Sequence, residues 1–102
     1  MKIYLDDIRN APDDSWTVIR DPNKVMMDYI TTFAIIDEIS FDHDLGENVA
    51  TGYDLLCWIE RNFAEGTFYG IKDCKFSIHS ANPVGCKNMQ AAIASIERLR
   101  NG

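Results

Sequence analysis

The chain has 102 residues, of which 46% are hydrophobic and 25% are charged, and its formal net charge is -6. These values are typical of one globular domain with a modest core, so we expect a single domain over residues 1–102 rather than a disordered chain. The negative charge disfavours duplex nucleic acid as a direct partner, and the lack of a signal-peptide pattern or membrane-length apolar run predicts a cytoplasmic protein that stays off membranes.

Residues 2–5 and 16–20 each predict a β-strand, because they are rich in side chains that favour extended backbone. Residues 6–15 between them show no apolar periodicity. A parallel crossover usually takes a dozen or more residues, so we expect either a loop in place of its helix or an unusual position for the second strand. Asp21-Pro22 predicts a helix start, since aspartate caps free amides and proline suits the first helical position. The buried face of this helix is expected to carry Val25, Met26, Tyr29, Ile30 and Phe33.

Residues 39–41 predict a third strand and residues 74–78 a fourth. The helix between them is expected to begin at Thr51, with Asp54 as its capping partner, and to end at Gly66. Asn82-Pro83 opens a last helix, whose shared apolar face comprises Met89, Ala92, Ile93, Ile96 and Leu99. Strands that alternate with helices indicate an α/β sandwich with about four mainly parallel strands and helices on both faces.

Polar residues stand directly after three of these strands: Asp6-Asp7, Asp42-His43-Asp44 and His79-Ser80. In an open parallel sheet, ligands bind just outside the carboxyl ends of the strands, so we expect these residues to form one site. The four aspartates offer the oxygen ligands that Mg²⁺ prefers, which predicts a divalent cation, Mg²⁺ or Mn²⁺, at this site.

The two histidines are candidate acid–base catalysts, because an imidazole titrates near neutral pH. Ser80 and Asn82 lead into the last helix, where free amides and the positive end of the helix dipole suit a phosphate oxygen. Arg9 follows the first acidic pair and could clamp a phosphate with two parallel hydrogen bonds, although pairing with an acid in residues 13–14 is an equal expectation.

These residues resemble the response-regulator receiver fold, in which Tyr4-Leu5-Asp6-Asp7 would stand for the metal-binding acidic pair. Strand alignment favours Asp42 as the counterpart of the phospho-acceptor aspartate, whereas the distance to Gly52 favours Asp44. Receivers place a phosphate-contacting lysine before a proline at the end of their last strand, and no lysine precedes Pro83.

The pattern is similar to a receiver-derived family, the cyclic-phosphate processing receiver domain. The stretches that carry the resemblance are residues 5–9, 40–46, 51–56 and 78–85. The resemblance implies a shortened receiver-like (flavodoxin-like) three-layer sandwich. It also implies an activity on cyclic phosphates of nucleotide-derived molecules, in bacterial or phage proteins.

We therefore hypothesise a phosphoesterase that opens a cyclic phosphodiester of a small nucleotide-derived substrate. The expected cation ligands are Asp6, Asp7 and either Asp42 or Asp44, with Asp42 preferred. The expected phosphate-binding residues are Arg9, Ser80 and Asn82, and the expected catalytic residues are His43, Asp44 and His79, with either histidine protonating the leaving oxygen. A variant of this scheme uses an aspartate as the nucleophile. The rival hypotheses are a signalling receiver that is phosphorylated on aspartate and a non-catalytic module that binds a nucleotide or a protein.

Overall fold

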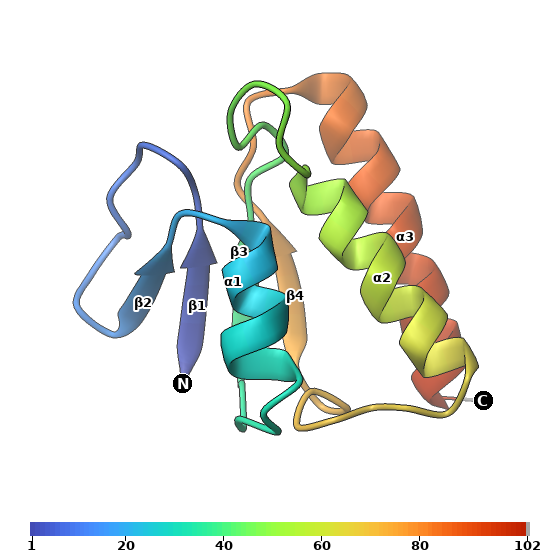
Figure 1. The fold of residues 1–102 in the computed structure, drawn as a ribbon. Coiled ribbons are helices and arrows are strands. Elements are labelled where there is room, and N and C mark those ends of the chain that lie inside the picture. Colours follow the sequence, from blue (N-terminus) through green and yellow to red (C-terminus); the bar gives the residue numbers. More distant parts are fainter. Residues whose placement is uncertain (102) are drawn as a thin grey trace.

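The computed structural model describes residues 1–101, which form one parallel sheet and its covering helices (Figure 1). The strands are β1 (Lys2–Leu5), β2 (Trp16–Ile19), β3 (Glu38–Phe41) and β4 (Lys75–Ile78), in the spatial order β2-β1-β3-β4. The helices are α1 (Pro22–Lys24), continued by the π-helix η1 (Val25–Ile30), then α2 (Gly52–Ala64) and α3 (Pro83–Asn101). The prediction of a shortened receiver-like α/β fold with four parallel strands is confirmed.

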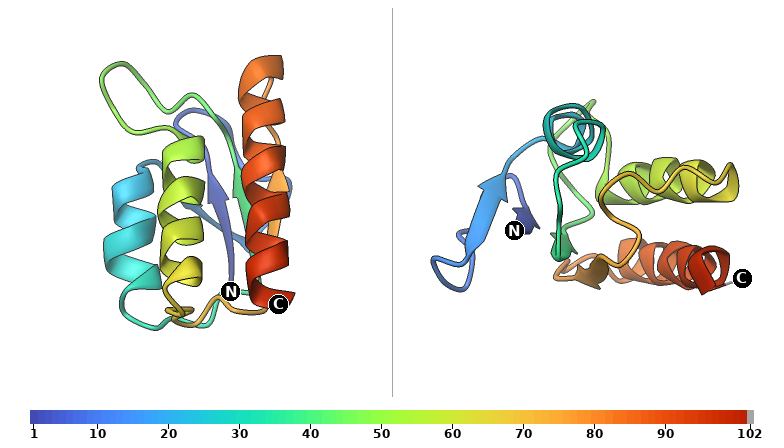
Figure 2. Two further views of the ribbon diagram at one scale, coloured as in Figure 1. Left: turned by 90° about the vertical axis from the view of Figure 1, so that its right-hand side faces the viewer. Right: turned by 90° about the horizontal axis from the view of Figure 1, so that it is seen from below.

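The two faces of the sheet differ in polarity, because side chains alternate along each strand. One face carries buried apolar residues, among them Ile3, Leu5, Ile39, Phe41 and Phe76. The same alternation and strand register give the opposite face Lys2, Tyr4, Trp16, Glu38, Ser40, Lys75 and Ser77. The helix formed by α1 and η1 and helix α2 lie over the apolar face, and α3 packs against α2 beside β4 (Figure 2). The core therefore lies between one face of the sheet and the helices.

The second helical layer expected from the sequence does not form within residues 1–101 (Figure 2). Right-handed crossovers from β2 to β3 and from β3 to β4 run in the same direction across the sheet, which places both of their helices on one face. The connection from β1 to β2 runs in the opposite direction and is the one that would supply a helix to the other face. Residues 6–15 form a loop there, so the loop alternative is the correct one.

Capping residues set the helix starts as expected. The Asp21 side chain accepts a hydrogen bond from the Asn23 amide at 2.9 Å. Thr51 and Asp54 form a reciprocal capping box at the start of α2. Each of these bonds satisfies an amide that has no partner inside its helix.

The first helix departs from its prediction after one turn. In η1 the Thr31 amide donates to the Met26 carbonyl, five residues back, at 3.0 Å. The π-helix ends at Ile30, and residues 31–33 form a turn. Phe33, expected on the buried face, instead has a φ of 63° and is 65% exposed. None of the helices in residues 1–101 is both long and apolar enough to cross a membrane.

Candidate functional site

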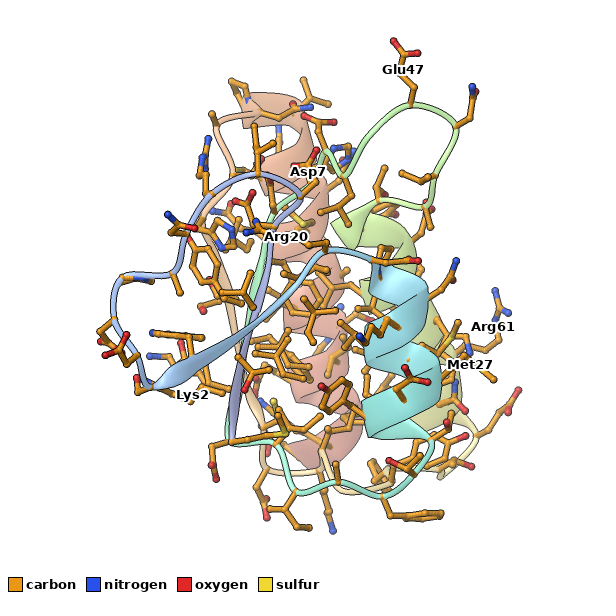
Figure 3. All side chains as sticks on the ribbon, turned by 60° about the vertical axis from the view of Figure 1, so that its left-hand side comes forward. Lys2, Asp7, Arg20, Met27, Glu47 and Arg61 are labelled. Atoms are coloured by element: carbon orange, nitrogen blue, oxygen red, sulfur yellow. The ribbon has the colours of Figure 1, made fainter. Side chains whose placement is uncertain are left out.

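The connections that follow β1, β3 and β4 meet at the carboxyl end of the sheet (Figure 1) and enclose a cleft of about 660 Å³. Figure 3 shows Asp7 and Glu47 at this end of the molecule and Lys2 at the other. Six of the nine predicted site residues line the cleft: Asp7, Arg9, Asp42, Asp44, Ser80 and Asn82. The remaining three, Asp6, His43 and His79, bond to residues of the wall from behind it.

Asp6 is fully buried, and both of its carboxylate oxygens are hydrogen-bonded. Oδ1 accepts from the amides of Ile8 at 2.9 Å and Arg9 at 2.8 Å, and Oδ2 accepts from Nε2 of His79 at 3.0 Å. Burial opposes ionisation, but these three hydrogen bonds outweigh it and hold the pKa of Asp6 below its usual value. Asp6 is therefore an anion that organises the loop after β1.

His79 has a protein partner at each ring nitrogen. Nε2 donates to Asp6, and Nδ1 lies 2.7 Å from Oγ of Ser40. The ring also stacks on Tyr4, with centroids 4.0 Å apart and planes 11° apart. The main-chain oxygen of His79 accepts from Nη1 of Arg9 at 2.8 Å. His79 thus holds Asp6 with its ring and Arg9 with its backbone, and it offers no free ring nitrogen to the cleft.

Asp42 directly follows β3, lines the cleft and is 7% exposed. Its Oδ1 accepts from the His43 amide at 2.8 Å, and the Ser80 hydroxyl also hydrogen-bonds to its carboxylate. Burial and the negative charge of nearby Asp6 nevertheless raise the pKa of Asp42 above its usual value. Asp42 therefore retains a proton more strongly than an ordinary aspartate does.

Asp44 lines the same cleft, but its surroundings favour the ionised form. Its Oδ1 accepts from Nδ1 of His43 at 2.9 Å, and its Oδ2 accepts from Nδ2 of Asn82 at 3.2 Å. These two hydrogen bonds lower the pKa of Asp44. The cleft wall therefore contains two aspartates whose pKa values are displaced in opposite directions.

Arg9 presents its guanidinium to the cleft and is about half exposed, with Nε 4.0 Å from Oδ2 of Asp6. Its side-chain partners within residues 1–101 are Asp6 and the His79 carbonyl, rather than the acids in residues 13–14. Within residues 1–101, Arg9 is the one cationic side chain on the cleft wall.

Asn82 and Ser80 form the turn between β4 and α3. Oδ1 of Asn82 caps the helix by accepting from the Gly85 amide at 2.9 Å, and its Nδ2 donates to Asp44. Both ends of the Asn82 amide group are therefore used within the protein. Oγ of Ser80 accepts from the Asn82 amide at 3.1 Å and reaches Asp42. Asn82 thus shapes the cleft wall, while Arg9 retains exposed donors for a ligand.

The model of one protein family, described as the cyclic-phosphate processing receiver domain, matches residues 1–95. The chain belongs to this family. No curated protein and no solved structure matched the chain. The resemblance expected from the sequence is therefore confirmed, and it associates this receiver domain with cyclic-phosphate processing.

This receiver domain brings three possible cation ligands together: Asp6, Asp42 and His79 place their ligand atoms within 4.8 Å of one another. The two carboxylates match the oxygen donors that Mg²⁺ and Mn²⁺ prefer. Asp7, expected in this set, lines the cleft outside the cluster. Burial and the nearby Asp6 charge raise the pKa of Asp42, and a cation between the two carboxylates would offset their repulsion, so Asp6 and Asp42 fit a cation at this position.

Two residues of the site lie inside strands, where a search for polar strand ends overlooks them. Tyr4 stacks on His79, and Ser40 hydrogen-bonds to its ring. Period-two alternation is the signal that could have found them, because it continues from Tyr4 to Asp6 and from Ser40 to Asp42 on one face of the sheet.

Three further residues that the prediction missed hold the loops in place. Nη1 of Arg20, near Asp7 in Figure 3, donates to the main-chain oxygens of Asp6 at 3.2 Å and Arg9 at 2.8 Å. A Cβ added at Gly52 would lie 2.0 Å from the Asp42 carbonyl oxygen, and one at Gly85 would lie 2.4 Å from Cγ of His43. Both glycines therefore allow a helix start to approach the β3 loop closely.

Proposed function

We propose that this receiver domain hydrolyses a cyclic phosphodiester of a small nucleotide-derived molecule in the strand-end cleft. The observation that carries the proposal is a pair of aspartates in one cleft with contrasting surroundings: Asp42 is buried near the Asp6 carboxylate, and Asp44 accepts hydrogen bonds from His43 and Asn82. These surroundings raise the pKa of Asp42 and lower that of Asp44. Two titratable groups separated in this way are suited to act as the acid and the base of one reaction.

Arg9 binds the anionic phosphodiester in this scheme. Its guanidinium can donate two parallel hydrogen bonds to phosphoryl oxygens, and its backbone is fixed by Asp6 and Arg20. Placing a fixed cation where negative charge develops stabilises the transition state without reorganisation. Ser80 contributes a hydroxyl on the same wall.

Asp44 is the general base and Asp42 is the general acid. Ionised Asp44 takes a proton from the attacking water, the water oxygen bonds to phosphorus, and one ring P–O bond breaks. Protonated Asp42 gives its proton to the departing sugar oxygen. An anionic substrate beside Asp42 raises the pKa of Asp42 further, since a nearby negative charge disfavours the carboxylate.

The histidines act through these aspartates rather than on the substrate. His43 donates to Asp44 and keeps it ionised, and His79 donates to Asp6, whose charge in turn raises the pKa of Asp42. The same bonds orient each carboxylate. Both are positioning residues in this scheme, not the acid expected from the sequence.

We propose that a divalent cation can bind in place of the Asp42 proton. Asp6 and Asp42 would hold it, with His79 adjacent. Bound there, it would supply charge neutralisation for the phosphoryl oxygens. The proton on Asp42 and the cation compete, because both compensate the same pair of carboxylates.

The test is phosphorus NMR of the protein with 2′,3′-cyclic nucleotides and with a cyclic phosphate of ADP-ribose, in EDTA and in added Mn²⁺. We expect ring opening to a phosphomonoester by the wild type in EDTA. Asp44→Asn should slow it by about 100-fold, a typical loss for a general base. Glu47→Gln is the matched control, because it makes the same change on an exposed residue of the same wall and should leave the rate unchanged.

Three results would contradict the proposal. Saturable binding without a new phosphorus signal would indicate a binding module. A stable acyl-phosphate formed from a small phosphodonor, without ring opening, would indicate a signalling receiver. Equal losses in Asp44→Asn and Glu47→Gln would remove Asp44 as the base.

A further inference from the structure

Ser40 is buried in the middle of the sheet, away from the cleft wall, and its hydroxyl has one side-chain partner, Nδ1 of His79, at 2.7 Å. On the other side of the ring, Nε2 of His79 lies 3.0 Å from Oδ2 of Asp6. The Asp6 carboxylate accepts from two backbone amides at Oδ1 and faces Nε2 with Oδ2, so the proton of a neutral His79 ring belongs on Nε2. Nδ1 is then an acceptor, and the Ser40 hydroxyl is its donor.

We propose that Ser40 is a positioning residue of the cleft, which fixes the His79 ring so that its Nε2–H points at Asp6. This role rests on the proposed function and adds a buried residue to it. Tyr4 holds the ring plane by stacking, but stacking still allows a half-turn about the Cβ–Cγ bond, which keeps the plane and exchanges the two ring edges. The Ser40 hydrogen bond removes that freedom by fixing which ring edge faces Asp6.

The effect of Ser40 reaches the cleft through a short chain of contacts. His79 holds Oδ2 of Asp6, and Oδ1 of Asp6 holds the Arg9 amide. The His79 carbonyl also accepts from the Arg9 guanidinium. Loss of the Ser40 hydroxyl should therefore loosen Arg9, the residue proposed to bind the phosphoryl group, without removing any group that touches the substrate.

Ser77 offers a matched control. It pairs with Ser40 in the register of β3 and β4, lies on the same face of the sheet, and hydrogen-bonds to Glu38 at 2.9 Å instead of to a histidine. Ser77→Ala thus removes an equivalent hydroxyl from the neighbouring strand.

The experiment is long-range ¹H–¹⁵N NMR of the imidazoles, with spectra recorded where they are neutral, in the wild type, Ser40→Ala, Ser40→Thr and Ser77→Ala. We expect Nε2 of His79 to carry the proton in the wild type. In Ser40→Ala, Nδ1 should shift toward the position of a nitrogen that accepts no hydrogen bond, and Ser40→Thr and Ser77→Ala should resemble the wild type. The ring-opening kcat/KM should fall by about tenfold in Ser40→Ala alone, with a lower kcat and a higher KM because Arg9 binds the phosphoryl group, as expected for one lost hydrogen bond.

An unchanged Nδ1 resonance in Ser40→Ala would overturn the inference, whether or not the protein opens cyclic phosphates. A proton on Nδ1 in the wild type would overturn it too, as would equal kcat losses in Ser40→Ala and Ser77→Ala. A wild type that shows the expected NMR pattern but opens no cyclic phosphate would instead contradict the proposed reaction and, with it, the catalytic part of this role.

Discussion

Asp6 and Asp42 are neighbouring buried carboxylates that differ in their hydrogen-bond donors. Asp6 accepts three hydrogen bonds and is stabilised as an anion, while Asp42 sits beside that anion with fewer donors. Burial, together with the negative charge of Asp6, consequently raises the pKa of Asp42. This is a common arrangement at sites of acid–base chemistry, where stability is given up to shift a pKa.

The two residues should have opposite effects on the pH dependence of stability. The folded-state pKa of Asp42 lies above its unfolded value, so its stabilising contribution is present below the unfolded value and is lost as the pH rises through the folded one. The free energy of unfolding of Asp42→Asn, relative to that of the wild type, should therefore increase as the pH rises from about 3 to neutral. The folded pKa of Asp6 is lowered, so its contribution is present above the unfolded value and is lost as the pH falls. For Asp6→Asn, the free energy of unfolding relative to that of the wild type should decrease over the same range.

Urea unfolding at the two pH values measures both effects. Each variant is compared with the wild type at the same pH, so general acid destabilisation cancels. Changes of the same sign in Asp6→Asn and Asp42→Asn would show that the two carboxylates do not differ in the way described.

At the scale of elements, the start of helix α3 positions the His43–Asp44 pair. Its first turn passes so close to the loop after β3 that a Cβ at position 85 would lie 2.4 Å from the His43 ring. The capping residue Asn82 bonds to Asp44 as well as to the Gly85 amide. The residue that caps α3 therefore also positions Asp44, the base of the proposed reaction.

Gly85→Ala should displace His43 and break its 2.9 Å bond to Asp44. Alanine is the better helix former by roughly 1 kcal/mol, so any net destabilisation reports the clash. We expect a loss of about 1–3 kcal/mol in the free energy of unfolding, typical of overpacking, and slower ring opening. Val84→Ala, at an exposed position of the same turn, should change stability by less than about 0.5 kcal/mol. Unfolding in urea and phosphorus NMR provide the measurements, and a Gly85→Ala protein as stable and active as Val84→Ala would refute the close approach.

The helix and strand bounds were largely predictable, because local signals set them. Proline at the first helical position and the Thr51–Asp54 capping box mark helix starts in the sequence itself. The π-helix was not predictable, because the same spacing of apolar residues is compatible with an ordinary α-helix. Only the structure shows which of these residues face the core. Phe33 lies in the turn beyond η1, with a φ of 63°, and is exposed.

At the scale of the whole molecule, the uncovered sheet face accounts for how the site is assembled. The short β1-to-β2 connection leaves that face without a helix in residues 1–101, and its carboxyl end is filled by Tyr4, His79 and the loop that carries Arg9. Asp6, Asp42 and His79 each continue the alternation of this face beyond their strands. The buried polar cluster therefore belongs to the side of the sheet that has lost a helical layer.

The location of the site could be predicted from the sequence, but the roles of its members could not. Parallel strands bring their polar ends to one edge, which was sufficient to place six of the nine residues on the cleft wall. Roles depend on which atoms face one another across strands. Only the structure shows that both nitrogens of His79 are occupied and that His43 lies behind Asp44.

The most direct test of the account is the pH dependence of cyclic-phosphate ring opening in EDTA, measured for the wild type and Asp42→Asn. If Asp44 is the base and Asp42 the acid, the wild-type rate should rise as Asp44 ionises and fall as the pH passes the raised pKa of Asp42. Asp42→Asn should be slower and should lack the fall at higher pH. A variant that keeps both the wild-type rate and that fall would contradict the assignment of Asp42 as the acid.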